Sequence, residues 1–215
     1  MKITALACPS WTTALPGLDE VHRVPERPGK DDVDPLLTDG SRLVVAGTDA
    51  DLAAVAVRLL RTERLATVEL AYLPVDPHSP AVQAWRLPTG PSALAAIVAG
   101  PAHPVPLVRD DAGGVLMGKG SMRIARGEAY CDAELVLRGA ARRLVVSPLA
   151  PVGVQVRVST GTLRRRVRAA HGRALQVGCL ETTVTCDGVE HPRPVKRWVW
   201  YKHTEDLRLV GTGGP

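Results

Sequence analysis

Two neighbouring carboxylates stand where they could hold a metal ion. Asp110 and Asp111 open a turn that ends in Gly113 and Gly114. Carboxylate oxygens are the ligands that Mg²⁺ takes from proteins, so this pair could form part of a metal site. The same pattern also describes an ordinary hairpin turn, in which an aspartate side chain bonds the backbone two residues further on. Both interpretations stay open, and the pattern favours the turn.

A glycine between a buried strand and a helix could let the backbone approach an anion. Gly47 follows the apolar run 42–46, and apolar residues repeat at helical spacing over 52–61. Glycine admits conformations that bring the N–H groups of a helix N-terminus close to a phosphate. The alternative is that Asp49 or Asp51 simply caps the helix. The carboxylate of Asp51 would oppose a phosphate unless a metal ion bridges the two.

The densest basic run of the chain lies in its second half. On a strand, Arg164, Arg166 and Arg168 would share one face because side chains alternate. Such a face suits phospholipid headgroups or polyphosphate. It equally suits a solvated strand that protects the exposed edge of a sheet. A further basic pair, Arg142 and Arg143, stands elsewhere in the same half.

Alternating strand and helix patterns indicate an α/β unit over residues 1–100. Continuous apolar runs predict buried strands, and apolar residues at helical spacing predict the helices that cover them. Residues 16–40 are rich in Pro, Asp and Gly and are expected to be loop with little regular structure. Strands that alternate with helices form a parallel sheet. The strands are expected at 3–7, 42–46 and 67–73, and the helices at 52–61, 80–85 and 92–99.

Residues 101–215 show a different pattern of short strands. Runs rich in β-branched residues recur between Gly and Pro, as in β-rich, sandwich-like units. The charge changes at the same place, because residues 1–100 carry 9 basic and 12 acidic groups whereas the rest carries 18 and 10. Two domains, 1–100 and 101–215, are therefore predicted. Trp198 and Trp200 alternate with cationic residues and are expected in the core or at an interface. The expected strands include 134–137, 143–147 and 195–201.

The composition of the 215 residues excludes several classes of protein. Hydrophobic residues make up 45% and charged residues 23%, close to globular proteins and unlike disordered chains. The four cysteines match no zinc-ligand spacing, so they are expected to be structural thiols. No segment reaches the roughly 18 apolar residues of a membrane span, and the first residues do not look like a signal peptide. A cytoplasmic protein is predicted, either free or peripheral to the inner face of the membrane.

Three segments resemble motifs of one enzyme family. Residues 44–52 resemble the strand, turn and helix of the diacylglycerol kinase-like lipid kinases, whose turn reads Gly-Gly-Asp-Gly-Thr. Residues 72–81 stand where the family has Pro-x-Gly-Thr-x-Asn-Asp-x-Ala-Arg. Residues 172–177 and 186–190 are similar to its late strand pair with an Asp-Gly-Glu turn. The resemblance covers most of the chain, which is shorter than typical members of the family.

The glycine turn departs from the family pattern at three positions. Gly47 and Asp49 stand where the family has them, whereas Thr48 and Ala50 replace glycines and Asp51 replaces threonine. The second motif has lost its glycines as well. The chain thus resembles a shortened catalytic domain with degenerate glycine-rich motifs.

The resemblance implies an α/β lobe of the NAD kinase and diacylglycerol kinase type, with a parallel sheet, followed by a β-rich, sandwich-like lobe. It implies ATP-dependent phosphorylation of a lipid hydroxyl such as diacylglycerol, with ATP and Mg²⁺ as cofactors. The residues expected at the nucleotide are Gly47, Thr48, Asp49 and Ser79, with Asp132 as the catalytic residue and Asp110 and Asp111 at the metal.

The degenerate turns leave a second interpretation open. In it the activity is weak or lost, and a non-catalytic relative binds a ligand or a protein. The partners expected are a lipid or anionic membrane surface, a nucleotide and a second copy in a homodimer. Four Trp, three Tyr and no Phe leave few rings to stack on bases, so no specific nucleic acid is expected.

Overall fold

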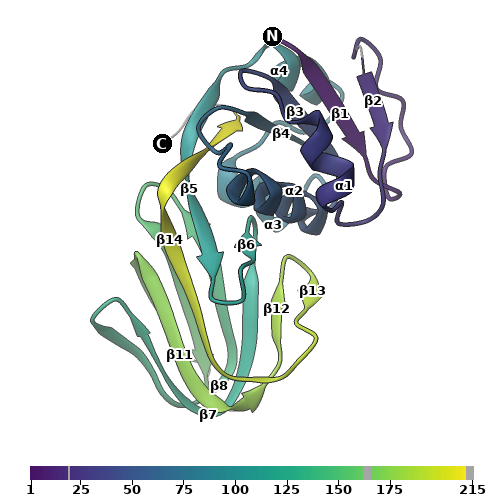
Figure 1. Cartoon of the computed structure of the whole chain (residues 1–215). Helices are drawn as coiled ribbons and strands as arrows, with labels where there is room; N and C mark the ends of the chain where they lie inside the picture. The colour runs from purple at the N-terminus through teal and green to yellow at the C-terminus, as the bar shows by residue number, and fades with distance from the viewer. Residues whose placement is uncertain (19, 162–165, 212–215) are drawn as a thin grey trace. The chain divides into compact units, whose positions relative to one another are not determined.

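The chain folds into two compact units. The computed structural model describes residues 1–18, 20–161 and 166–211. The first unit comprises Met1–Val105 and the chain from Glu205 on, and the second comprises Pro106–Thr204. The last strand, β14 (Val195–Val210), drawn in yellow in Figure 1, therefore supplies its final residues to the first unit. A single boundary at residue 101 does not describe this return of the chain.

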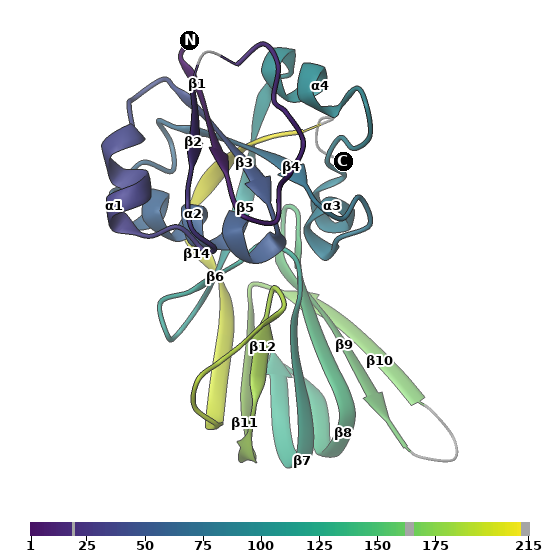
Figure 2. The ribbon, with the colours of Figure 1, turned by 90° about the vertical axis from the view of Figure 1, so that its right-hand side faces the viewer.

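Parallel strands and helices form the first unit (Figures 1 and 2). The strand order is β14–β4–β3–β1–β2, and every neighbouring pair in it is parallel. The elements are β1 (Ile3–Ala7), β2 (Glu20–Arg23), α1 (Lys30–Val33), the 3-10 helix η1 (Asp34–Leu36), β3 (Arg42–Gly47), α2 (Asp49–Arg61), β4 (Glu69–Pro74), α3 (Pro80–Trp85) and α4 (Ala93–Ala99).

Strand β3 is buried along its whole length because the sheet is covered on both faces. Val44 and Ala46 pack in one cluster with Ile97 of α4. Alternation turns Leu43 and Val45 to the opposite face, on which α2 lies against β3 and β4 (Figure 1). The continuous apolar run of the sequence is thus explained by two layers of helix rather than by one.

Antiparallel strands form the second unit. The order β10–β9–β8–β7–β11–β14 is antiparallel throughout, and the hairpin of β12 and β13 pairs with β7. The elements are β5 (Ala102–Asp110), which begins in the first unit, β6 (Val115–Leu116), β7 (Gly120–Cys131), β8 (Glu134–Leu149), β9 (Gly153–Thr160), β10 (Arg166–Gly172), β11 (Ala174–Thr182), β12 (Val184–Cys186) and β13 (Val189–Glu190).

Two tryptophans anchor the core of the second unit. Trp198 and Trp200 of β14 are 4% and 0% exposed, and their rings meet edge to face at 6.0 Å. Arg197, which precedes Trp198, is exposed, whereas both rings are buried, so the expected place of the tryptophans in the core is confirmed. Gly120 faces Trp200, and a Cβ there would lie 2.7 Å from the ring. Only glycine lets β7 approach the tryptophan this closely.

The fold class expected from the sequence is confirmed, since parallel strands interleaved with helices precede an antiparallel β-rich region. The expectation that residues 16–40 are loop is wrong, because they contain β2 and α1. Each of these has only four residues, and such short elements carry no readable apolar period. The runs 134–137 and 143–147 are parts of one strand, β8.

Candidate functional site

A capping box closes the turn between β3 and α2. Thr48 is the N-cap of α2, and its hydroxyl accepts a hydrogen bond of 3.3 Å from the Asp51 N–H. In return, Asp51 Oδ2 accepts the backbone N–H and the hydroxyl of Thr48, both at 2.8 Å. These residue types at this spacing satisfy N–H groups that have no partner inside the helix. Asp51 therefore takes part in capping α2, as the second interpretation of the turn predicted.

The carboxylate of Asp51 fills the space beside the turn. Asp51 is 1% exposed, and its Oδ1 accepts the Arg27 N–H at 2.7 Å. A Cβ on Gly47 would lie 2.5 Å from Asp51 Oδ2, so the room left by the glycine is taken by this carboxylate. Burial, assisted by the negative charge of Asp51, raises the pKa of the neighbouring Cys8 thiol to about 12. The thiol stays protonated, as expected of a structural cysteine.

Asp49 links the two motifs of the first unit. Its Oδ1 accepts the Tyr72 hydroxyl at 2.9 Å, and its Oδ2 accepts the Ala81 N–H of α3 at 3.0 Å. Ser79 caps the same helix, because its Oγ accepts the Val82 N–H at 3.3 Å. The structure thus brings Asp49 and Ser79 together at the start of α3. Burial and the Asp49 charge raise the pKa of Tyr72, which remains a hydrogen-bond donor.

This turn does not fit a nucleotide phosphate. A phosphate at a helix N-terminus uses free backbone N–H groups, whereas the N–H groups of Thr48 and Ala81 already bind carboxylates of this chain. Two carboxylates in the same place would also repel a phosphate. The nucleotide role of Gly47, Thr48, Asp49 and Ser79 stays a prediction from the resemblance.

Asp110 is used inside its own hairpin. It is 6% exposed, and its Oδ1 accepts the N–H groups of Ala112 at 3.0 Å and Gly114 at 2.7 Å. Burial raises the pKa of Asp110 above its ordinary value, although these two hydrogen bonds act against the rise. Within residues 1–18, 20–161 and 166–211, no group of three or more His, Cys, Asp or Glu could hold a metal ion. The metal role of Asp110 and Asp111 stays a prediction.

Asp132 anchors a turn of the second unit. It lies between β7 and β8 with a φ of 49°, and its carboxylate accepts the N–H groups of Arg173 and Ala174 at 2.9–3.1 Å. Asp187, between β12 and β13, accepts the three N–H groups of residues 117–119, each at 2.8 Å. Both carboxylates hold backbone turns in place. Its catalytic role stays a prediction.

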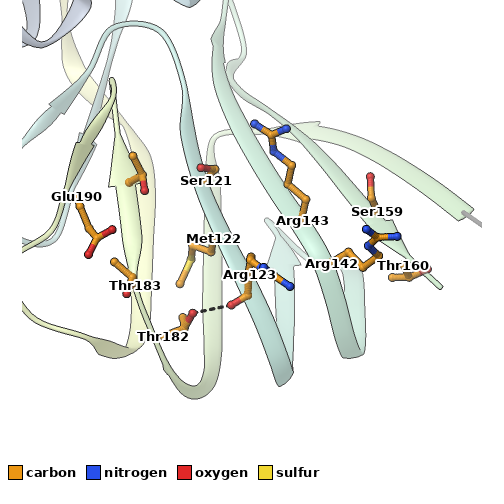
Figure 3. A pocket seen from close by; sticks show the side chains of 11 residues that line it. Ser121, Met122, Arg123, Arg142, Arg143, Ser159, Thr160, Thr182, Thr183 and Glu190 are labelled. Atoms are coloured by element: carbon orange, nitrogen blue, oxygen red, sulfur yellow. Dashed lines mark hydrogen bonds between the residues drawn. The ribbon is translucent and has the colours of Figure 1, made fainter. Parts of the chain in front are cut away.

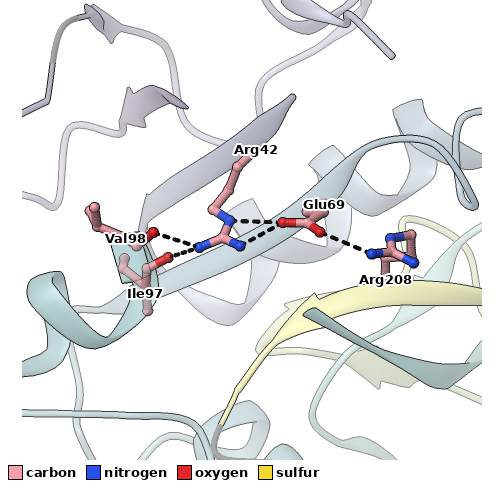
Figure 4. A network of polar contacts seen from close by, with 5 residues as sticks. All are labelled: Arg42, Glu69, Ile97, Val98 and Arg208. Carbon is pink, nitrogen blue, oxygen red and sulfur yellow. Dashed lines mark hydrogen bonds and ion pairs between the residues drawn. The ribbon is translucent and has the colours of Figure 1, made fainter. Parts of the chain in front are cut away.

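A buried charge network stabilises the first unit (Figure 4). Arg42 Nε and Nη2 donate to Glu69 Oε2 at 3.0 and 2.6 Å, and Arg208 Nη2 donates to Glu69 Oε1 at 2.9 Å. Arg42 Nη1 donates to the carbonyls of Ile97 and Val98 at the end of α4. Burial acts to raise the pKa of Glu69, but hydrogen bonds from Arg208 and Arg42 outweigh it and lower the pKa.

A polar pocket lies on the second unit, lined by residues of β7, β8 and β9 and of the segment from the end of β11 to β13 (Figure 3). Its volume is about 690 Å³. Three arginines, four threonines, two serines, one methionine and one glutamate line it. The arginines are Arg123 on β7 and Arg142 and Arg143 on β8. This composition differs from that of the turn after β3, where the charged groups are carboxylates.

Solved structures share this architecture over nearly the whole chain. A putative diacylglycerol kinase from Bacillus anthracis str. Sterne aligns with a TM-score of 0.70 and 12% identity, over 98% of this chain and 97% of that one. The chain has the diacylglycerol kinase-like fold. An NAD kinase from Archaeoglobus fulgidus, solved in complex with ATP, has the same diacylglycerol kinase-like fold and aligns with a TM-score of 0.57 and 12% identity, over 97% of this chain and 93% of that one.

A yeast NADH kinase, complexed with NADH, also matches the diacylglycerol kinase-like fold of this chain. The TM-score is 0.52 at 9% identity, over 99% of this chain and 84% of that one. Neither protein-family models nor curated proteins match the sequence. The resemblance stated from the sequence is confirmed as a likeness of structure. None of the helices in the described residues is long and apolar enough to cross a membrane.

Sequence reasoning missed several residues of these sites. Tyr72 lies inside an apolar run and gives no sign that its hydroxyl meets Asp49. Arg123 is separated from Arg142 and Arg143 by two strand segments and a hairpin, so their meeting on one face is invisible without the pairing of β7 and β8. The signal in the sequence that marks Arg123 as a surface residue is its place between the apolar residues Met122 and Ile124.

Proposed function

We propose that this chain is a non-catalytic relative of the lipid kinases, a ligand-binding protein built on their fold. Phosphoryl transfer at the turn after β3 is lost. The observation that carries the proposal is the Asp51 carboxylate, which bonds Thr48 and Arg27 and occupies the space beside Gly47. Asp49 supports it further, since both of its oxygens hold α3 and β4 in place.

A second candidate function is ATP-dependent phosphorylation of a lipid hydroxyl, such as that of diacylglycerol. The likeness to the diacylglycerol kinase and NAD kinase structures favours it. This candidate requires the turn to rearrange, so that the Asp51 carboxylate leaves the Thr48 N–H and a nucleotide with Mg²⁺ takes its place. A homodimer, an anionic membrane partner and a cytoplasmic location remain predictions for either candidate.

The experiment compares phosphate transfer in two forms of the protein. Wild type and the variant Thr48→Gly/Ala50→Gly/Asp51→Thr, whose turn reads as in the family, are incubated with radiolabelled ATP, Mg²⁺ and extracted lipids. A diacylglycerol kinase of established activity serves as the positive control of the assay. We expect no transfer by wild type. Transfer by wild type that is lost in Asp49→Ala would overturn the proposal and establish the kinase.

Nucleotide binding is measured separately as the shift in melting temperature with ATP and Mg²⁺. We expect no shift for wild type and a rise for the triple variant, because the variant frees the Thr48 N–H and removes a carboxylate. Asp32→Thr is the matched control, since Asp32 accepts the Gly29 N–H at the start of α1 as Asp51 accepts the Thr48 N–H at the start of α2. A clear shift for wild type would contradict the proposal.

A further inference from the structure

A β-bulge gathers the three arginines of the pocket. Met122 pairs with Leu144, and Ile124 pairs with Ala141, so one residue of β7 stands opposite two of β8. Those residues are Arg123 on β7 and Arg142 and Arg143 on β8. In a regular strand, Arg142 and Arg143 would point to opposite faces, but a bulge re-aims one of them.

Burial confirms the direction of these side chains. Ala141 and Leu144 are buried in the core, whereas Arg142 and Arg143 between them are both exposed. Arg123, between buried neighbours on β7, is exposed as well. Figure 3 shows the three side chains on the pocket wall formed by β7 and β8. The bulge therefore places three guanidinium groups on a single surface.

These arginines have no carboxylate partner among the residues that the structure describes. Two arginines elsewhere on the surface of the second unit do have such a partner, Arg138 with Glu128 and Arg168 with Glu134. Glu190 is the one acidic residue of the described pocket lining, and it makes no ion pair with Arg123, Arg142 or Arg143 within the described part of the chain. The pocket thus keeps an excess of two positive charges.

Hydroxyl groups complete a surface suited to phosphate oxygens. Arg143 pairs with Ser159 across β8 and β9, and Ser121 pairs with Thr185 across β7 and β12. Thr182 fixes the adjoining loop, since its hydroxyl donates to the Arg123 carbonyl at 2.6 Å. Guanidinium groups with neighbouring hydroxyls are the donors that bind phosphate bidentately. A volume of about 690 Å³ admits a ligand of nucleotide size.

We propose that this pocket, the bulge pocket, binds a phosphate-bearing anion, with Arg123, Arg142 and Arg143 as its cationic ligands. The anion is either free, as in a pyrophosphate or polyphosphate, or the headgroup of a phospholipid. The inference does not depend on whether the chain transfers phosphate, because it concerns residues other than those of the turn after β3.

The first test measures pyrophosphate binding by isothermal titration calorimetry without Mg²⁺. We expect wild type to bind, and Arg142→Ala/Arg143→Ala to bind at least about tenfold more weakly, because charge-assisted hydrogen bonds are lost. The matched control is Arg197→Ala, an exposed arginine on β14 that does not line the pocket. Equal weakening by Arg197→Ala would overturn the proposal, and so would a wild type that binds neither pyrophosphate nor the acidic vesicles described below. Circular dichroism checks that the variants are folded.

A second variant should strengthen binding, which no loss of folding can imitate. Glu190→Gln removes the repulsion between Glu190 and the anion, so we expect pyrophosphate to bind about two- to fivefold more tightly. The control is Glu63→Gln, which changes an exposed glutamate of the first unit and alters the net charge by the same amount. We expect it to leave pyrophosphate binding unchanged. Unchanged binding by Glu190→Gln would place the anion outside the bulge pocket and contradict the proposal.

Vesicles distinguish the two sources of the phosphate. Phosphatidylcholine vesicles with and without phosphatidic acid are sedimented with wild type and with Arg142→Ala/Arg143→Ala. Binding to the acidic vesicles alone, lost in the double variant, identifies a lipid headgroup as the ligand. Pyrophosphate binding without vesicle binding identifies a free anion. Vesicle binding that the double variant retains, together with no pyrophosphate binding, would overturn the bulge pocket as an anion site.

Discussion

The turn after β3 and the bulge pocket differ in whether their charged side chains have partners within the described part of the chain. At the turn, each carboxylate oxygen of Asp49 and Asp51 accepts a hydrogen bond from a donor of the same chain. At the bulge pocket, Arg123, Arg142 and Arg143 have no ion-pair partner among the described residues. A charge neutralised within the fold stabilises it, whereas an unneutralised cluster is available to a ligand. The likeness of the fold to kinases would have drawn attention to the turn alone.

The largest expected effect concerns the charge network of the first unit. Arg42→Ala leaves Glu69 without a buried partner and frees two carbonyls of α4, so we expect a loss of about 3 to 5 kcal/mol in the free energy of unfolding. Urea denaturation measures it. Arg64→Ala breaks the exposed pair with Asp39 and should change stability far less. The geometry indicates that the charge of Glu69 is neutralised within the fold. Equal losses of stability in both variants would contradict this.

Asp49→Ala should produce the next largest loss of stability. It leaves the buried Tyr72 hydroxyl and the Ala81 N–H without their acceptor, which together cost about 2 to 4 kcal/mol. Tyr72→Phe removes only the hydroxyl and should cost about 1 kcal/mol. Thermal unfolding of the two variants compares them. Asp49→Ala as stable as wild type would make Asp49 a free carboxylate and contradict its structural role.

Gly47→Ala tests how fully Asp51 occupies the turn. The added Cβ would lie 2.5 Å from Asp51 Oδ2 and 3.1 Å from Cys8 Cβ. We expect a loss of about 1 to 3 kcal/mol, the range of overpacked cores. Gly178→Ala is the control, because a Cβ at Gly178 meets nothing within 4 Å. Chemical denaturation that finds both variants equally stable would mean that the turn has room for a ligand.

The smallest effect is a pH dependence from Glu69. Its pKa in the folded protein lies below the ordinary 4.5, so its charge stabilises the fold fully above that pH. This contribution is lost as the pH falls through the lowered pKa. Glu69→Gln should therefore flatten the acid side of a stability curve measured by urea denaturation. Asp110 has a raised pKa, so Asp110→Asn should remove a contribution of the opposite sign.

The α/β unit could be predicted because its strands and helices carry readable periods. The expected range 80–85 coincides with α3, and the buried run 42–46 coincides with β3 apart from Gly47. The return of β14 to the first unit could not be predicted, since its last residues pair in parallel with β4 through Leu209 and Leu70. Such a pairing depends on register between distant segments, which a local pattern does not contain.

The candidate sites were only half predictable for the same reason. The glycine turn was found because Gly47, Thr48 and Asp49 are contiguous, and the capping alternative was visible in Asp51 itself. The bulge pocket could not be predicted, because its arginines come together through an irregularity in the pairing of β7 and β8. The basic run that was singled out lies partly outside the described residues, at Arg164. Within them, Arg166 and Arg168 are exposed on β10.

The bulge in β8 bears on how a chain of this fold can change by single-codon insertion or deletion. Removing either Arg142 or Arg143 would leave one residue between Ala141 and Leu144, which restores the regular ladder against Met122 and Ile124. Ala141 and Leu144 would still face the core, so one guanidinium could be lost in this way without a shift of register. The extra positive charge is thus a separable addition to the sheet, acquired or discarded independently of the hydrophobic interior.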